Sequence, residues 1–488
     1  MNMVITAVCV SSLFVVHGAL GIQAAPVPLP APQQNSTPVA GQLLTPPSPP
    51  PAAPNSLVSA PGPVPGGGGV SLVPTTETAV LSSPVPTISP TWGYRVAVIG
   101  DEIFATGPER AMSPGSFGQL CTWTRTGTTT WKADANLVQL ARAQGGDVGL
   151  QRLERGGPFI FTAVNRDNVG TTVRVLKPSG GKLAEVAEVA LPTNTNVPTF
   201  GSSFASDGAT LAVGSADMRF SVLTSSTERV RDPKVYIYSN RQGIWNLDGF
   251  VKAPTSVVGT PSEAMWFGAA LDVDADVLAV GRPATLLVRH GESMPISIAS
   301  RVHVYRRLAG QWMPEAELLG AAVTDMQSFG IGVAVEGDTL IVRGIDSSIP
   351  ETTARVWVYA RIGGSWVFRQ ELVPAAGITP GRAFGTSMAI SKGHIVIGDT
   401  YAHGADEIGD ANPGMALLFE ERDGRWVNTA RLMPAAPCMQ HNFGNDVAVD
   451  WPIVVVGRTK SERLGLEPGG AYVFDLSGSG QAVSPRPQ

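Results

Sequence analysis

Beyond residue 90, short stretches of alternating apolar and polar residues are followed at regular intervals by continuous apolar runs that end in glycine. The alternating stretches, such as Val333–Val335, predict strands with one face exposed, and the apolar runs predict strands buried on both faces. A third apolar stretch rich in aromatic residues, such as Val356–Tyr359, and a glycine turn followed by tryptophan, such as Gly364–Trp366, complete each unit. Each unit therefore predicts four consecutive antiparallel strands.

The four-strand unit recurs about every fifty to sixty residues, a spacing typical of propeller blades. Most units open with a Phe-Gly pair. These pairs are Phe200-Gly201, Phe267-Gly268, Phe329-Gly330, Phe384-Gly385 and Phe443-Gly444, with Trp92-Gly93 as a variant. A degenerate unit without the pair begins near Gly146. The seven units predict an all-β fold, a seven-bladed β-propeller with four-stranded antiparallel blades.

The Phe-Gly pair, the apolar strand ending in glycine, the aromatic third strand and the Gly-x-Trp turn resemble the FG-GAP repeat. That repeat builds the propellers of integrin α-subunits and of secreted bacterial and fungal proteins, and the resemblance covers about residues 77–476. It implies a propeller that serves adhesion, sugar binding or catalysis, without choosing among them.

Integrin-like repeats carry a metal loop in the first tight turn, and Asp272, Asp274 and Asp276 stand around that turn. They lack the glycine and the later acidic ligand of a calcium loop. We therefore expect no metal there and no cofactor in the protein.

The seventh unit stops after its third strand, at Asp475. Its missing outer strand is expected in Thr78–Leu81, which matches Thr429–Leu432 of the sixth unit in position and polarity. We expect this N-terminal strand to close the ring and to bury Val80 and Leu81, because an unpaired apolar edge invites aggregation.

Residues 1–76 contain no Lys, Arg, Asp or Glu. Residues 1–25 are typical of a secretory signal peptide, although no Lys or Arg precedes the apolar run, which leaves an uncleaved anchor as the alternative. Residues 26–76, rich in Pro, Ala and Gly, predict a disordered linker that serves as a spacer or as a ligand of a proline-reading domain. Residues 477–488 predict a disordered tail. We expect a secreted or extracellular protein without a membrane span after signal removal.

The composition restricts the partners. Charged residues make up 15% of the chain, the net charge is -5, and the arginines are scattered, so nucleic acid is not an expected partner. Signal removal would leave Cys121 and Cys438, either as two separate thiols or as one bridge. We expect a monomer.

The connections between second and third strands are the long ones, and they leave the blades on the same face as the blade-to-blade connections. Because loops on a rigid scaffold carry recognition, we expect the binding site on this long-loop face. Arg282, Arg343 and Arg458 follow the second strands of three blades. They either ring the axis and bind a carboxylate or sulfate, with Asp399 as a further ligand-binding residue, or are separately solvated or paired.

One loop of the sixth unit gathers polar side chains, and His441 follows in the next blade-to-blade connection. The loop residues are Asp399, Tyr401, His403, Asp406, Glu407 and Asp410. They would hold a cation, supply a Tyr/His pair for proton abstraction, or form a loose acidic surface.

None of the common hydrolase, redox, zinc-protease or phosphate-loop motifs occurs in the chain. The leading interpretation is a secreted, non-enzymatic propeller that binds a glycan or a protein partner through its long-loop face. The alternative is a carbohydrate-active enzyme such as a polysaccharide lyase, with Tyr401 and His403 or His441 as base and acid and an arginine that neutralises a uronate. An enzyme would bring Tyr, His and Arg together in one pocket, whereas a binding protein need not.

Overall fold

Seven antiparallel sheets follow one another along the chain in the computed structural model, each with four strands in the order of a propeller blade. All described residues belong to one compact unit, Ala60–Gln488. They are residues 72, 74–82, 92–107, 119–134, 138–139, 150–166, 170–179, 182–190, 200–216, 233–253, 266–283, 285–287, 296–298, 300–319, 327–346, 353–404, 414–435, 442–459 and 469–477. The predicted fold class is confirmed.

The first three blades contain the following strands. Blade 1 has β3 (Val96–Ile99), β4 (Glu102–Thr106), β5 (Gln119–Arg125) and β6 (Trp131–Ala133), with β7 (Val138–Gln139) also on β5. Blade 2 has β8 (Leu150–Gly156), β9 (Phe159–Arg166), β10 (Gly170–Ser179) and β11 (Lys182–Val189). Blade 3 has β12 (Phe204–Ser206), β13 (Thr210–Gly214), β14 (Lys234–Arg241) and β15 (Ile244–Lys252).

The next three blades repeat this order. Blade 4 has β16 (Ala270–Asp274), β17 (Val277–Arg282), β20 (Arg301–Leu308) and β21 (Gln311–Leu318). Blade 5 has β22 (Gln327–Glu336), β23 (Thr339–Asp346), β24 (Thr353–Ile362) and β25 (Ser365–Glu371). Blade 6 has β27 (Ser387–Ser391), β28 (His394–Asp399), β30 (Met415–Arg422) and β31 (Arg425–Met433).

Blade 7 joins both ends of the described chain. It has β32 (Phe443–Asp450), β33 (Ile453–Arg458) and β34 (Gly470–Asp475), and its outer strand is β2 (Ala79–Leu81), antiparallel to β34. The predicted closing strand is thus confirmed. Leu81 is buried as expected, but Val80 is 45% exposed, so the closing strand buries only one of its two large apolar side chains.

A further strand, β1 (Pro74–Thr76), adds in parallel to β31 of blade 6. It lies within residues that the sequence assigned to the linker. The N-terminal segment therefore joins two neighbouring blades rather than one.

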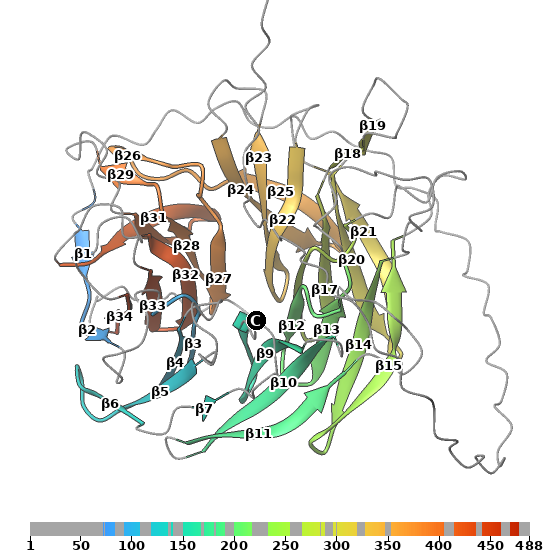
Figure 1. Cartoon of the computed structure of the whole chain (residues 1–488). Helices are drawn as coiled ribbons and strands as arrows, with labels where there is room; N and C mark the ends of the chain where they lie inside the picture. The colour runs from blue at the N-terminus through green and yellow to red at the C-terminus, as the bar shows by residue number, and fades with distance from the viewer. Residues whose placement is uncertain are drawn as a thin grey trace, which may run out of the picture. The chain divides into compact units, whose positions relative to one another are not determined.

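The first strands of the blades form a closed ring around the axis, visible in Figure 1. β3 contacts β8, β8 contacts β12, and the same relation continues through β16, β22, β27 and β32, which returns to β3. The apolar core is divided accordingly, because each of seven clusters of buried side chains lies between two adjacent blades. Every Phe of the Phe-Gly pairs, and Trp92, is buried in these seams.

The recurrence of glycines at fixed positions in the repeats has a steric cause at the contacts between blades. The glycine after each repeated Phe, and Gly93, has a positive φ between 77° and 86°, a region that side chains disfavour. The glycine that ends the second strand is needed for a different reason: a Cβ on Gly281 would collide with the backbone oxygen of Gly330 in the next blade. Gly398 stands in the same relation to Gly444, and Gly457 to Gly93.

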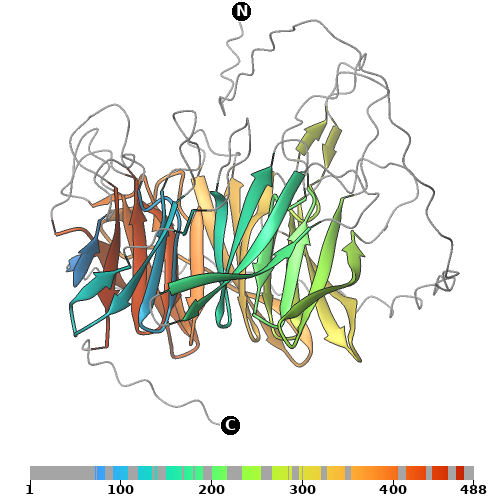
Figure 2. The ribbon, with the colours of Figure 1, turned by 60° about the horizontal axis from the view of Figure 1, so that its bottom comes forward.

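The two ends of the blades differ, as Figure 2 shows from the side. The tight turns between first and second strands gather at one end. The small sheet of β18 (Thr285–Leu287) and β19 (Ile296–Ile298), inserted between the second and third strands of blade 4, lies at the other end. We call the second end the long-loop end.

Candidate functional site

Arg343 cross-links blades 5 and 6 at the long-loop end. It lies in β23, at the position where blades 4, 6 and 7 have Gly281, Gly398 and Gly457, and it is 7% exposed. Its Nε donates to the backbone oxygen of Phe384 at 2.8 Å, and its Nη2 donates to that of Arg382 at 3.2 Å. Burial lowers the pKa of Arg343 to about 10, while the Asp399 carboxylate opposes this shift. The guanidinium therefore stays charged at neutral pH, and its hydrogen bonds hold blades 5 and 6 together.

Asp399 ends β28 and is fully buried. Its Oδ2 accepts a hydrogen bond from the backbone N of Gly381 at 2.6 Å, and its Oδ1 accepts one from the backbone N of Tyr401 at 3.0 Å. Burial raises the pKa of Asp399, and these backbone donors and Arg343 oppose the rise. The carboxylate thus ties the connection between blades 5 and 6 to the loop that follows β28.

Arg382 and Tyr401 face solvent above this buried pair. The guanidinium of Arg382 lies 4.6 Å from the centre of the Tyr401 ring, and its Nη2 donates to Tyr401 Oη at 3.2 Å. Both residues are exposed, Tyr401 by 38%. Asp399 binds the backbone of the residue before Arg382 and that of Tyr401 itself, so it fixes both partners from below.

A small sheet next to this pair gives the two segments a second connection. β26 (Ile378–Thr379) pairs with β29 (His403–Gly404), with Thr379 opposite His403. His403 is therefore placed near Tyr401 by its backbone. His441, Asp406, Glu407 and Asp410 lie outside the described residues.

Arg282 and Arg458 end the second strands of blades 4 and 7. Arg458 is buried, and its guanidinium lies 5.4 Å from the ring centre of Tyr472 in its own blade. Arg282 acts electrostatically on His303, also in its own blade. None of the three arginines lines the axial cavity described next. Their predicted ligand-binding role stays a prediction.

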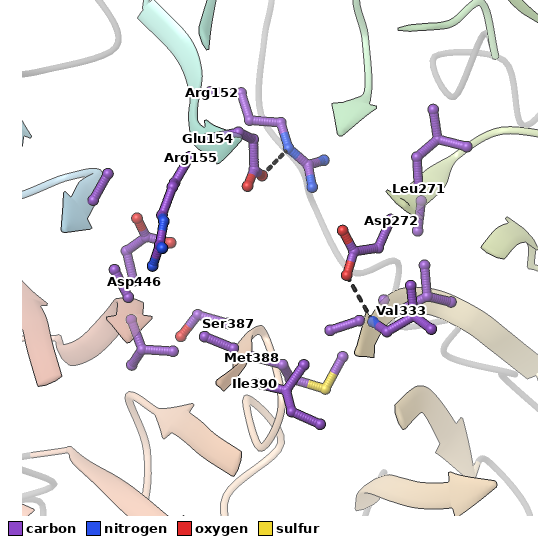
Figure 3. Close-up of a pocket in the computed structure, with 18 of the residues that line it drawn as sticks. Arg152, Glu154, Arg155, Leu271, Asp272, Val333, Ser387, Met388, Ile390 and Asp446 are labelled. Atoms are coloured by element: carbon purple, nitrogen blue, oxygen red, sulfur yellow. Dashed lines mark hydrogen bonds and ion pairs between the residues drawn. The ribbon is translucent and has the colours of Figure 1, made fainter. Parts of the chain in front are cut away.

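A cavity of about 590 Å³ lies on the axis of the ring, lined by the first strands of the blades (Figure 3). Arg152, Glu154 and Arg155 of blade 2 occupy one side of it, and Met388 and Ile390 of blade 6 the opposite side. The sequence analysis did not single out any of these residues. The sequence did contain an indication of this site, because the first strand of blade 2 departs from the repeat pattern.

The aspartates weighed for calcium join neighbouring blades. Asp272 Oδ2 accepts a hydrogen bond from Val335 N at 2.6 Å, and Asp274 Oδ2 accepts one from Gly337 N at 2.6 Å, both in blade 5. Asp276 forms an ion pair with Arg306. The first strand of a blade has an edge toward the axis whose backbone N–H groups have no partner strand, and these carboxylates accept hydrogen bonds from some of those N–H groups.

The same device recurs between blades 7 and 1. Asp446 accepts from Val96 N at 2.8 Å, and Asp450 accepts from Gly100 N at 2.7 Å. Burial raises the pKa of Asp446 to about 6, although Arg95 and the Val96 N–H oppose the rise. Within the described part of the chain, no group of three or more His, Cys, Asp or Glu side chains is arranged to hold a metal ion.

The structure tests only some of the remaining expectations from the sequence. Cys121 is a buried free thiol, and burial, with Asp134, raises its pKa to about 12. Cys438 lies outside the described residues, as do residues 1–25. No helix long and apolar enough to cross a membrane occurs in the described ranges.

Comparison with known proteins gives likeness of fold only. No family model matches the chain, and no curated protein matches it. A chain of a mitotic checkpoint complex is 12% identical with a TM-score of 0.46, over 83% of this chain and 96% of that one. The propeller domain of the Trilobed protease of Pyrococcus furiosus is 11% identical (TM-score 0.43, 78% and 94% covered). The periplasmic gluconolactonase of Pseudomonas aeruginosa is 13% identical (TM-score 0.38, 72% and 86% covered). The fold assignment rests on the strand ladders.

Proposed function

We propose that the protein is a non-enzymatic, FG-GAP-type propeller that binds an acidic glycan at its long-loop end. The observation that carries the proposal is the exposed Arg382–Tyr401 pair, which the buried Asp399 and Arg343 hold from below. A preorganised site loses little conformational freedom on binding, so its contacts contribute more of their energy to affinity.

The chemistry of the pair suits a saccharide with a carboxylate or sulfate group. The guanidinium offers charge-assisted hydrogen bonds to the anionic group. The tyrosine ring offers a flat apolar surface and a hydroxyl for the sugar itself. Arg282 and Arg458 remain candidate contacts at the same end, and a protein partner remains the other ligand class.

We also propose that the protein is secreted and acts as a monomer. The support is the charge-free stretch of residues 1–76, with an apolar start and a Pro-rich continuation. In this arrangement the linker would act as a spacer before the propeller.

The test is a glycan-array screen of the propeller, followed by calorimetry with the best acidic oligosaccharide. Arg382→Ala and Tyr401→Ala should each weaken binding by about 1.5 to 3 kcal/mol, the range for hydrogen bonds to charged groups. Arg369→Ala is the matched control, because Arg369 is an exposed arginine on the outer strand of blade 5. Unchanged affinity in both site variants would refute the proposal.

A lyase is the second candidate, favoured by the hydrogen bond from Arg382 Nη2 to Tyr401 Oη. In this candidate mechanism Tyr401 Oη would act as the base, and Arg382 would neutralise the carboxylate of the uronate. His403 or His441 would then act as the acid. Release of an unsaturated product from a uronate polymer, lost in Tyr401→Phe, would replace the binding proposal with this one.

A further inference from the structure

The residues that line the axial cavity can be compared between blades, because one position of the first strand is present in all seven. It is the third residue pair from the tight turn between first and second strands, where in blade 3 the pair next to the turn is Asp207 and Thr210, joined by a hydrogen bond from Asp207 N to Thr210 O. Five blades have alanine there: Ala97, Ala205, Ala334, Ala389 and Ala448. The other two have Glu154 and Asp272. Alanine is therefore compatible with the fold at this position, and the two carboxylates add charge to the cavity beyond the contact that Asp272 makes with Val335 N.

Blade 2 departs from the repeat at a second position. The residue pair next to the turn-proximal one has Val98, Ser206, Val273, Val335, Ile390 and Val449 in six blades. Blade 2 has Arg155 there. The first strand of the degenerate blade thus brings charged side chains into the cavity (Figure 3).

Each arginine of the cavity wall has a carboxylate partner. Arg152 Nε lies 2.6 Å from Glu154 Oε1, and Arg155 Nη1 lies 3.0 Å from Asp450 Oδ1. Arg95 Nη1 lies 3.6 Å from Asp446 Oδ1. These pairs leave no guanidinium to balance a further anion in the wall.

Asp272 is a further anionic side chain of the cavity wall, beyond the carboxylates that pair with these arginines. Its oxygens accept hydrogen bonds from the backbone N of Val335 and of Val273, and it has no ion-pair partner among the described residues. Asp207, Asp274 and Glu336 also line the cavity, so carboxylates outnumber guanidiniums there. The cavity wall therefore carries a carboxylate, Asp272, that is available to pair with a positively charged ligand.

The opposite wall is apolar. Val333, Met388 and Ile390 lie across the cavity from blade 2, with Asp272 and Asp446 between the two sides (Figure 3). A volume of about 590 Å³ falls in the range of small-molecule sites. The cavity therefore combines an excess of negative charge with an apolar surface.

We infer that the axial cavity is a binding site for an organic ammonium ion, whose charged nitrogen lies beside the Asp272 carboxylate and whose apolar arm packs on Met388 and Ile390. The site shares no residue with the Arg382–Tyr401 pair, so it is independent of the proposed glycan binding. The flexible Met388 side chain adapts to arms of different shape.

Proton linkage gives a second signature of this site. Burial raises the pKa of Asp272 to about 7, with the Glu154 and Asp274 carboxylates adding to the shift and the backbone N–H groups of Val335 and Val273 opposing it. An ammonium ion prefers the ionised carboxylate. Its binding should therefore release a proton and tighten by about five- to tenfold between pH 6 and pH 8.

The test is calorimetric titration of the full-length chain with n-hexylammonium chloride at pH 8, with hexan-1-ol as the uncharged analogue. Hexylammonium should bind, and hexanol should bind at least about tenfold more weakly. Asp272→Ala, which introduces the residue of five other blades, should weaken hexylammonium binding by about tenfold or more. Asp338→Asn removes the same charge from an exposed turn and should leave binding unchanged.

Three results would overturn the inference. These are equal binding of hexanol and hexylammonium, equal binding of hexylammonium by the wild type and Asp272→Ala, and no binding of hexylammonium at all. If Asp272→Ala failed to fold, Asp272→Asn, which keeps an oxygen acceptor for Val335 N, would take its place with the same expected loss.

Discussion

Arg343 of blade 5 donates a hydrogen bond from its Nε to the backbone oxygen of Phe384 in blade 6, at 2.8 Å. The corresponding residue in blade 4 is Gly281, which lies against the backbone oxygen of Gly330 without a side chain between them. Blade 5 therefore replaces close backbone contact with a buried guanidinium. This exchange is accompanied by Gly332 opposite Arg343, which leaves room for the longer side chain.

Replacement of Arg343 should loosen the seam between blades 5 and 6. Arg343→Ala removes the donor to the oxygens of Phe384 and Arg382, and it leaves buried Asp399 without its nearby positive charge. The free energy of unfolding should fall by about 2 to 4 kcal/mol, measured by urea denaturation. Arg369→Ala, an exposed arginine, should change it by less than about 0.5 kcal/mol. Equal stability of the two variants would contradict a structural role for Arg343.

His303 should make the propeller sensitive to acid. It is 2% exposed, packs against Phe267, and neither ring nitrogen has a hydrogen-bond partner among the described residues. Burial lowers its pKa to about 4, with Arg282 and Arg301 adding to the shift and Glu317 opposing it. Between pH 6.5 and 4 the unfolded chain takes up a proton that the folded chain does not. Stability should therefore fall by about 2 to 3 kcal/mol as the pH drops through this window.

Blade 6 offers the matched variant for this test, because Leu417 occupies the position of His303. His303→Leu should flatten the dependence of melting temperature on pH between 6.5 and 4, while stability at pH 7.5 stays the same or rises. A variant that keeps the full acid sensitivity of the wild type would assign that sensitivity to other groups.

Asp272 should have the opposite pH dependence. Its folded-state pKa of about 7 lies above the ordinary value of 3.8, so between these values the folded chain keeps a proton that the unfolded chain has lost. This contribution to stability is present at low pH and is lost as the pH rises through 7. Asp272→Asn should be about 1 to 3 kcal/mol more stable than the wild type at pH 8 and close to it at pH 4. Thermal unfolding at both pH values measures the difference, and a variant less stable at pH 8 would refute it.

The contribution of the closing strand β2 to stability should come mainly from the Leu81 side chain. Leu81 is 5% exposed and belongs to the apolar cluster between blades 7 and 1, whereas Val80 is 45% exposed. Leu81→Ala should cost about 2 kcal/mol or more, and Val80→Ala less than about 0.5 kcal/mol. Chains that start at Pro86 should melt at a lower temperature and be less soluble than chains that start at Gly69. Equal melting temperatures of the two truncated chains would exclude β2 as a structural closure.

The blade pattern could be predicted because its requirements are local. The positive φ of Gly201 or Gly444 and the buried rings of Phe200 and Phe443 are needed in each repeat, so they recur in the sequence at a fixed spacing. The closing strand was found by the same logic, since a blade with three strands lacks one. β1 was missed because three residues, Pro74–Thr76, are too few to show an alternating pattern.

The candidate sites were harder to predict because they depend on contacts between repeats. Arg343 looked available to a ligand, but its partners lie in the next blade. Arg382 was not singled out, since only the tertiary structure places it over Tyr401. Glu154 lies in the degenerate blade, where the lost Phe-Gly pair removed the register that would have aligned it with Asp272.

The pairing of β2 with β34 has a consequence for synthesis of the chain. β2 is made first and its partner last, and at about 5 to 20 residues per second roughly 20 to 80 seconds separate them. During that interval the early blades can stack on one another, but the ring stays open and the first strand waits without a partner. A chain released before Gly470 would keep the open ring, so completeness of translation is a condition for the native state.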